Sequence, residues 1–381
     1  MIAAVLFTAA VLAAPPQPAH ARATQLVQQL GDPSFKVREK AADDLIDLGS
    51  AAVDALRLGL KSTDIEIHDR CVKLLPKALD ARVQEQIVEF LAEPDGPIPP
   101  DLPCIKRWVS IAGTGKASRE MYAEIIKAHR KILVEVDQHP EKTAQTFTAF
   151  CQEVYNRQRA VPNLEARKEV VTYPDACLFL FLGSDPNARK GGAPVATNYT
   201  QSILMLNSPH TTGMLSGSGA NESGKALFLG WLEQERYPTL VRRGFGIAAT
   251  ANLKEALPMV MRFVNDKTAT PSIRSSALAS SAKLFDRESL KLIEPLLKDD
   301  TLIAKTTING STASTEMRDV ALGVSVQAMG QKPADYGFDR FKEANPAVGV
   351  VSTSNYVYAL SDKAREAAFK KWQDWLDQNP K

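Results

Sequence analysis

Five segments of the chain share a short pattern: an apolar residue, a basic residue, two variable residues and then, in most cases, a small residue. The basic residues of the first two segments are 30 residues apart, and those of the last three are 32 and 44 residues apart. Such self-similarity is typical of stacked helix pairs. The segments are VREKA at Val37, IHDRC at Ile67, VRRGF at Val241, IRSSA at Ile273 and MRDVA at Met317. The pattern predicts an all-α chain, an α-solenoid of antiparallel helix pairs with an irregular, loop-rich centre.

The stretch FKVREKAADDLIDLGSAAVDALRLGL shows how one such pair is encoded. Its apolar residues recur at the spacing of one helix face. Gly49 and Ser50 separate the two helical stretches, as a C-terminal glycine followed by a new helix cap. The first stretch carries Val37, Ala41, Leu45 and Leu48, and the second carries Val53, Leu56 and Leu60. We therefore expect two antiparallel helices joined by a very short turn.

These helix pairs resemble HEAT repeats. Four longer segments resemble, more narrowly, a group of secreted bacterial HEAT-repeat proteins of undefined activity: DPSFKVREKAADDLIDLG, RWVSIAGTGKASREMYAEIIKAHRKIL, FLGSDPN and STEMRDVALGVSVQAMGQKPADYGF. The resemblance spans most of the chain. It implies the fold and export from the cell, and it brings no catalytic motif with it.

The resemblance also concerns the repeated basic residues. In HEAT repeats the matching arginine often contacts an acidic residue, which implies that Arg38, Arg274 and Arg318 lie near carboxylates such as Asp47 or Asp319. The chain departs from the repeat in two places, with His68 instead of arginine and with the glycines around Phe245. We expect distorted repeats there.

The N-terminus predicts export. Thirteen uncharged, mostly apolar residues run from Ile2 to Ala14, followed by prolines and the A-x-A sequence Ala19-His20-Ala21. The run is shorter than the roughly 20 residues of a membrane-spanning helix. We predict a signal peptide over residues 1–21, a mature chain from Arg22, and a secreted or periplasmic protein without stable membrane insertion. An ordinary buried helix is the alternative interpretation, which the prolines disfavour.

Composition and spacing predict the further divisions of the chain. The Pro-rich segment AEPDGPIPPDLP, residues 92–103, breaks the repeat pattern. The predicted parts are N-terminal HEAT-like repeats over 22–92, a central helical section over 93–235, a second set of repeats over 236–337, and a linker with a C-terminal capping helix over 338–381.

The central section alternates helical and irregular sequence. We predict helices over 118–136, 141–158, 165–183 and 224–235, and loops over 183–200 and 207–223, which are rich in Gly, Ser, Asn and Pro. Two segments are β candidates. ACLFLFL at Ala176 is equally consistent with a buried helix, and TTINGST contains Asn309-Gly310, a tight-turn signal for a hairpin. Further amphipathic helices are expected in 251–266, 286–300 and 361–378.

The stretch GSGANESGKA, Gly217 to Ala226, differs by one residue from a phosphate-binding loop. Ala226 stands where the motif needs a hydroxyl for Mg²⁺, and no strand precedes the glycines. We therefore expect Asn221, Glu222 and Ser223 to cap a helix that begins near Gly224, with Lys225 facing solvent. In the similar GTGKAS, we expect Ser118 to be a helix N-cap.

Histidines and cysteines give little support to a catalytic or metal site. We expect His129 to be exposed on a basic helix and His139 to lie in a turn. His210 is the candidate placed where a site could form, near four hydroxyl residues, Ser208, Thr211, Thr212 and Ser216, although a G-x-S-x-G motif is missing. The cysteines show neither C-x-x-C nor a histidine at ligand spacing: Cys71, Cys104, Cys151 and Cys177. We predict no catalytic residue, no cofactor and no metal, and we expect the four tryptophans to lie in the core.

The charge distribution favours a protein partner. Charged residues make up 24% of the chain, the net charge is +2, and both signs are interspersed, which disfavours nucleic-acid binding. The resulting hypothesis is an exported scaffold that binds another macromolecule on its concave surface without catalysis. The alternative is a hydrolase or small-ligand protein that uses the region from Asn207 to Gly224, and it requires a pocket with convergent polar groups beside that region.

Overall fold

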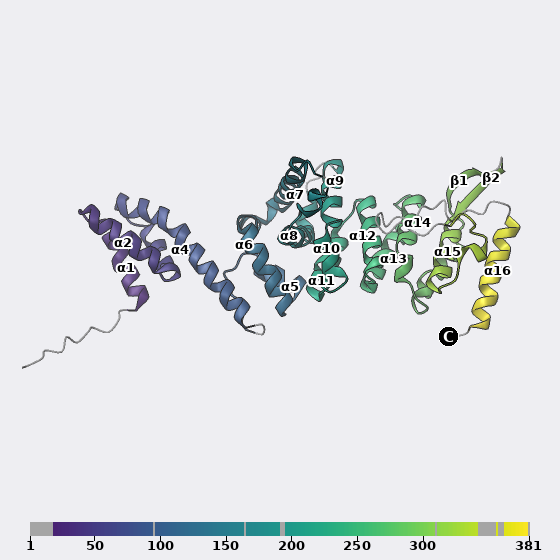
Figure 1. The fold of residues 1–381 in the computed structure, drawn as a ribbon, viewed down its shortest axis with the longest axis horizontal. Helices are drawn as coiled ribbons and strands as arrows, with labels where there is room; N and C mark the ends of the chain where they lie inside the picture. Colours follow the sequence, from purple (N-terminus) through teal and green to yellow (C-terminus); the bar gives the residue numbers. More distant parts are fainter. Residues whose placement is uncertain are drawn as a thin grey trace, which may run out of the picture. The chain divides into compact units, whose positions relative to one another are not determined.

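The structure is a computed structural model that is mostly α-helical, with one two-stranded sheet (Figure 1). It forms two compact units, Met1–Leu102 and Pro103–Lys381, and the division falls in the Pro-rich segment. The structure describes residues 18–93, 96–163, 165–190, 195–308, 311–341, 356 and 362–379.

The first unit, unit 1, contains α1 (Ala19–Gln29), α2 (Phe35–Asp47), α3 (Val53–Gly59) and α4 (Ile65–Ala92). Helix α2 packs against α1 and α4, and α3 packs against the same two helices. The predicted short turn is confirmed: Gly49 has φ +55°, which favours glycine, and a single 3-10 turn leads from it into α3. Apolar residues from all four helices, among them Leu26, Leu45, Leu56 and Cys71, form one core.

The first half of the second unit, unit 2, surrounds one buried helix, α8. All residues of α8 from Asp175 to Gly183 are buried, so ACLFLFL is a core helix and not a strand. Helices α6, α7 and α11 pack around it. The helices of this half are α5 (Ile105–Ala112), α6 (Lys116–Gln138), α7 (Thr143–Ala160), α8 (Tyr173–Gly183), α9 (Val195–Leu206), α10 (Pro209–Leu215) and α11 (Glu222–Gln234).

In the second half of unit 2 the helices are grouped around α14. Helix α14 packs against α12, α13 and α15, and the C-terminal α16 packs against α15, as predicted for a cap (Figure 1). Strands β1 (Leu302–Ile308) and β2 (Ser311–Glu316) pair antiparallel, with Ile308 opposite Ser311. The predicted hairpin is therefore confirmed, while its turn residues lie outside the described ones. The helices are α12 (Pro238–Thr250), α13 (Leu257–Asn265), α14 (Pro271–Ser280), α15 (Met317–Ala328) and α16 (Asp362–Gln378).

Several local predictions were wrong. The single helix expected over 165–183 is a 3-10 turn, Ala166–Glu169, followed by α8, because Pro174 and the Thr172–Asp175 capping box start a new helix. The helix expected in 286–300 consists of two 3-10 segments, Ser289–Leu292 and Glu294–Lys298. Pro295 lies in the first turn of the second segment, where its missing N–H is tolerated.

The predicted loops of the central section were partly wrong, since α9 begins inside the first, at Val195, and α10 lies within the second. Ser208 caps α10 by accepting a hydrogen bond from the His210 N–H, and Pro209 occupies the first helical turn. The expected distortion around Phe245 was wrong as well, because α12 is continuous there.

Candidate functional site

A small pocket opens between α10 and α12 in unit 2, beside the region from Asn207 to Gly224. Its volume is about 60 Å³. One water molecule needs about 10–15 Å³, so the pocket has room for about four water-sized groups. This is far below the roughly 300–1,000 Å³ of pockets for drug-sized ligands. Its lining residues include three hydroxyl residues, two apolar residues and one arginine: Thr212, Ser216, Thr250, Leu215, Ile247 and Arg243.

The hydroxyls in this lining are tied to the backbone. Thr250 Oγ1 donates to the Gly246 carbonyl over 2.9 Å, and Ser216 Oγ donates to the Thr212 carbonyl over 3.2 Å. Thr212 Oγ1 donates to the Ser208 carbonyl. With their protons engaged in this way, the hydroxyls present acceptor oxygens to the pocket, which leaves Arg243 as its main donor.

Arg243 is a partly buried cation whose hydrogen-bond partner is neutral. Its Nε and Nη2 both donate to Oδ1 of Asn207, the former over 3.0 Å. Burial lowers the pKa of Arg243, and the nearby Tyr199 phenol acts in the opposite direction. Within the described part of the chain, Arg243 forms no ion pair with a carboxylate. The described residues therefore leave its positive charge uncompensated.

Other partly buried arginines of unit 2 are paired differently. Arg107 contacts Asp185, Arg189 lies 2.8 Å from Glu235, and Arg157 lies 2.8 Å from Asp175. In each pair the carboxylate is almost fully buried. Sequence reasoning missed Arg243, since the repeat pattern drew attention to its neighbour Arg242. The doubled basic residue in VRRGF was the available signal.

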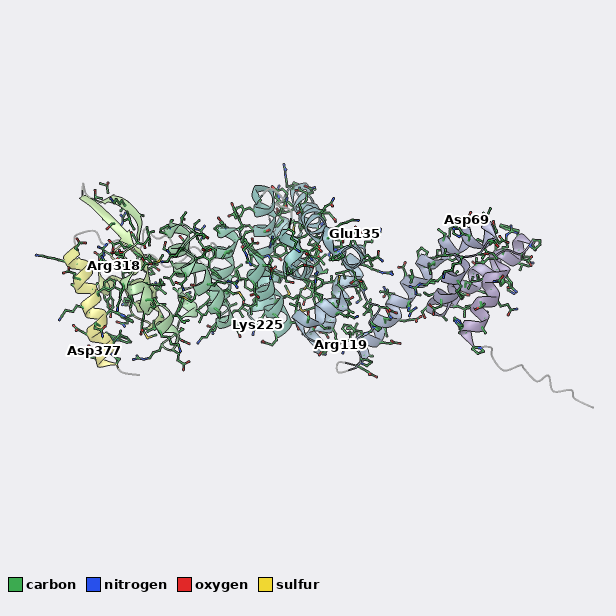
Figure 2. The ribbon with its side chains drawn as sticks, turned by 180° about the vertical axis from the view of Figure 1, so that it is seen from behind. Asp69, Arg119, Glu135, Lys225, Arg318 and Asp377 are labelled. Atoms are coloured by element: carbon green, nitrogen blue, oxygen red, sulfur yellow. The ribbon has the colours of Figure 1, made fainter. Side chains whose placement is uncertain are left out.

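The glycine-rich candidate is a helix cap, as predicted. Asn221 accepts a hydrogen bond from the Gly224 N–H over 2.8 Å, and α11 begins at Glu222. Lys225 lies in the first turn of α11 (Figure 2). Its side chain is 30% exposed, so it is partly buried and less exposed to solvent than expected. Its Nζ is 2.8 Å from Glu222 Oε1, so the lysine pairs with its own helix.

The prediction for Ser118 was wrong. Helix α6 begins at Lys116 with Gly115 as its N-cap, and Ser118 is fully buried. The Ser118 hydroxyl donates to the Gly113 carbonyl over 2.6 Å and accepts from Trp108 Nε1 over 2.8 Å. Its role is to join α5 to α6 in the core.

The repeated basic residues all lie near the starts of helices, in α2, α4, α12, α14 and α15. The three arginines do contact carboxylates, but not the ones suggested. Arg38 lies 3.1 Å from Glu66, Arg274 3.6 Å from Asp299, and Arg318 2.6 Å from Glu316. His68 instead contacts the backbone, with Nδ1 2.9 Å from the Leu60 carbonyl.

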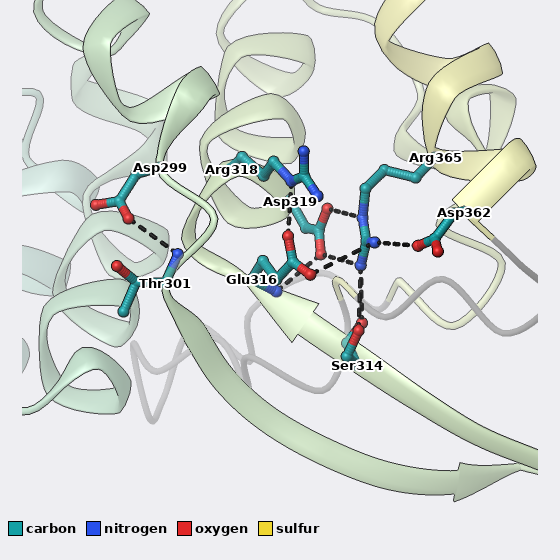
Figure 3. A network of polar contacts seen from close by, with 8 residues as sticks. All are labelled: Asp299, Thr301, Ser314, Glu316, Arg318, Asp319, Asp362 and Arg365. Carbon is teal, nitrogen blue, oxygen red and sulfur yellow. Dashed lines mark hydrogen bonds and ion pairs between the residues drawn. The ribbon is translucent and has the colours of Figure 1, made fainter.

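Asp319 lies in a network that joins α16 to α15 and also includes the Arg318–Glu316 pair (Figure 3). Arg365 Nε and Nη2 lie 2.8 and 3.1 Å from the two Asp319 oxygens, and both side chains are buried. The Glu316 N–H also donates to Asp319, which completes a capping box for α15. Burial would lower the pKa of Arg365, but hydrogen bonding to Asp319 raises it.

His129 was expected to be exposed, and this was wrong. Its side chain is 15% exposed, and Nε2 lies 3.0 Å from Oδ1 of Asp175, which is 1% exposed. The backbone of α6 departs from helical geometry at His129, which marks a kink. Burial would raise the pKa of Asp175, but contacts with His129, Thr172 and Arg157 outweigh it and lower the pKa to about 2.

The remaining candidates are accounted for as follows. His139 ends α6 in a turn, as predicted, and His210 is exposed on α10 with its ring against Tyr173. Three tryptophans, Trp108, Trp231 and Trp372, are buried as predicted, and Trp375 stacks on Trp372. All four cysteines are free and buried.

In the described ranges, no group of three or more histidine, cysteine or acidic residues could hold a metal ion. No helix among the described residues is long and apolar enough to cross a membrane. Comparison of the chain with known protein families, with curated proteins and with solved structures finds no match.

Proposed function

We propose that this protein is an exported scaffold of HEAT-like helix pairs, stacked as an α-solenoid, which binds a protein partner and performs no catalysis. Stacked helix pairs are expected to leave an extended concave surface for such a partner. The recurrence of basic residues at the starts of five helices supports the repeat architecture.

One observation carries the binding proposal: exposed large apolar side chains are concentrated in unit 1. Of the nine such residues in the described part of the chain, seven lie between residues 35 and 91. They are Phe35, Ile46, Leu58, Ile65, Val72, Val88 and Leu91. Single exposed apolar residues are ordinary, whereas a concentration on one small unit is typical of an interaction surface.

Three of these residues form what we call the Phe35–Val72 patch: Phe35, Ile65 and Val72, which are 64%, 77% and 50% exposed. Phe35 and Ile65 are the first residues of α2 and α4 and occupy equivalent positions in two successive repeats. Val72 follows Ile65 by two helical turns and so lies on the same face of α4.

An ion-pair network holds the two helix starts of this patch together. Arg38 lies 5.7 Å from the centre of the Phe35 ring and 3.1 Å from Glu66. Arg70 contacts both Glu66 and Glu39, at 2.6 and 2.9 Å. The patch is thus an apolar surface with a charged rim, an arrangement that fits protein–protein contact better than membrane insertion.

Site-specific photocrosslinking in the exporting cell tests the proposal. A photoreactive residue at position 35 or 65 should yield an adduct with the same second protein, and one at Leu292, which is 37% exposed in unit 2, should not. Against that purified protein, the double variant Phe35→Ser/Ile65→Ser should bind about tenfold or more weakly, with Leu292→Ser as the matched control. Equal adducts at all three positions, or adducts with copies of this chain alone, would contradict the proposal.

The alternative of a small-ligand protein is favoured by one observation, the pocket beside the region from Asn207 to Gly224. Its volume restricts it to a very small ligand or to a single side chain of a larger one. The two functions differ in where they respond to mutation. A scaffold loses its partner through substitutions at the Phe35–Val72 patch, and a small-ligand protein loses its ligand through substitutions at Arg243.

A further inference from the structure

The pocket between α10 and α12 combines two independent features. It is a cavity that the protein leaves open, and its lining residues include Arg243, a partly buried arginine whose guanidinium has an amide as partner. Three other partly buried arginines of unit 2, Arg107, Arg157 and Arg189, are neutralised by buried carboxylates. At Arg243 the protein supplies a neutral oxygen where those sites supply a negative one.

A second cation on the same helix adds to the positive charge. Arg242 is half-buried, its Nε is buried without a hydrogen-bond acceptor, and the described residues provide it with no carboxylate. The N-terminal half of α12 therefore carries two adjacent positive charges without compensation. An anion bound in the pocket would be attracted to both.

The rest of the lining indicates which kind of anion fits. Leu215 and Ile247 are apolar, and the hydroxyls nearby have their protons engaged with backbone carbonyls. A phosphate, with four oxygens, would need donors on several sides. A carboxylate needs one forked donor such as arginine, and its aliphatic stem can lie against the apolar side chains.

We propose that this pocket binds a carboxylate group on a short aliphatic stem, with Arg243 as its charge partner. The group can come from a glutamate or aspartate side chain of a bound protein or from a free small carboxylate. In the first case the pocket is a second point of contact for the scaffold's partner. The carboxylate assignment itself does not require the scaffold proposal to be correct.

The test is NMR titration of the full mature chain with ¹⁵N-labelled arginine and glycine. Sodium acetate should shift the Arg243 Nε and Gly246 amide signals saturably, and sodium chloride at equal ionic strength should not. A blocked glutamate, N-acetyl-glutamate N-methylamide, distinguishes the two sources. If the blocked glutamate binds more tightly than acetate, the pocket is assigned to a protein side chain. If acetate binds more tightly, it is assigned to a free carboxylate.

Two variants make the test specific. In Arg243→Gln the Gly246 response to acetate should weaken about tenfold or more, the scale of a lost charge-assisted contact. Asn207→Asp should have the same effect with the fold intact, because it supplies the missing carboxylate from within the chain. Arg262→Gln, which removes an exposed arginine paired with Glu233, is the matched control and should leave the response unchanged.

Three results would overturn the proposal. The first is an equal response to chloride and acetate, and the second is tighter binding of inorganic phosphate than of either carboxylate. The third is an unchanged acetate response in Asn207→Asp. Loss of partner adducts at the Phe35–Val72 patch would not affect any of these outcomes, so the two proposals fail separately.

Discussion

Arg365 and Asp319 are 46 residues apart in sequence, and Arg365 Nε lies 2.8 Å from Asp319 Oδ1 in the interior of unit 2. This pair fastens the C-terminal helix α16 to α15 (Figure 3). Removing one member of a buried pair leaves the other charge without compensation, which typically costs about 3–5 kcal/mol. We expect Arg365→Met to lower the free energy of unfolding of unit 2 by an amount of that order.

Urea unfolding, followed by circular dichroism, measures this effect. Lys363→Met, at an exposed position of the same helix, should leave the midpoint nearly unchanged. The double variant Arg365→Met/Asp319→Leu should recover part of the loss, since it removes both buried charges. Equal midpoints for Arg365→Met and Lys363→Met would show that the pair does not fasten α16.

Acid should destabilise unit 2 through Asp175. The folded-state pKa of this carboxyl is about 2, below its ordinary value of 3.8. Its contribution to stability is therefore complete above about pH 5 and is lost as the pH falls from there towards 2. The shift corresponds to on the order of 2 kcal/mol. The unfolding free energy of the wild type should fall as the pH is lowered from 7 to 3. In Asp175→Asn, the unfolding free energy at pH 7 should be lower than in the wild type, and it should fall less over the same pH range.

A steeper acid response in Asp175→Asn than in the wild type would contradict this assignment. Asp69, an exposed acid of unit 1, provides the comparison. Asp69→Asn should keep the wild-type slope.

Substitution by alanine should change the stability of the protein in opposite directions at Gly244 and at Gly213. A Cβ at Gly244 would lie 2.6 Å from Leu232 Cδ1 and 3.0 Å from the Trp231 ring, so α12 could not approach α11 as it does. Gly244→Ala should cost about 1–3 kcal/mol by overpacking. At Gly213, in α10, a Cβ meets no atom within 4 Å, and Gly213→Ala should stabilise by about 0.4–1 kcal/mol.

Thermal unfolding of the two variants side by side gives the comparison. If the two variants change the melting temperature in the same direction, close packing at Gly244 does not explain the difference between the two positions.

Export predicts a specific new N-terminus. The A-x-A sequence Ala19-His20-Ala21 after an apolar run predicts a mature chain that begins at Arg22. Intact-mass analysis of protein recovered from outside the cytoplasm should give the mass of residues 22–381. A cytoplasmic protein that still carries residues 1–21 would contradict both the predicted cleavage and the proposed export.

Local sequence signals predicted the helix starts well. The short turn at Gly49, the cap at Asn221 and the hairpin around residues 308–311 all depend on residues a few positions apart, and all are present. Local composition gave a wrong prediction where the same polar residues occur both in loops and in helix caps. Ser208 and Pro209 belong to a composition typical of loops, yet they are also the cap and first turn of α10.

The contacts that define candidate sites are distant in sequence and could not be predicted in this way. His129 is surrounded by lysine and arginine in sequence, but its partner is Asp175, on a helix that begins 44 residues later. Likewise, Arg243 and Asn207 meet because α9 ends where α12 passes, and no local pattern records this. Periodicity encodes which face of a helix is buried, but not which side chain lies opposite.

The Arg365–Asp319 pair also makes the burial of Asp319 depend on a segment that is synthesised later than α15. Arg365 follows Asp319 by 46 residues, and until it has been synthesised it cannot neutralise the Asp319 carboxylate. We therefore expect α15 and α16 to become protected from proteases together, so that a chain cut between them should lose protection at α15 as well.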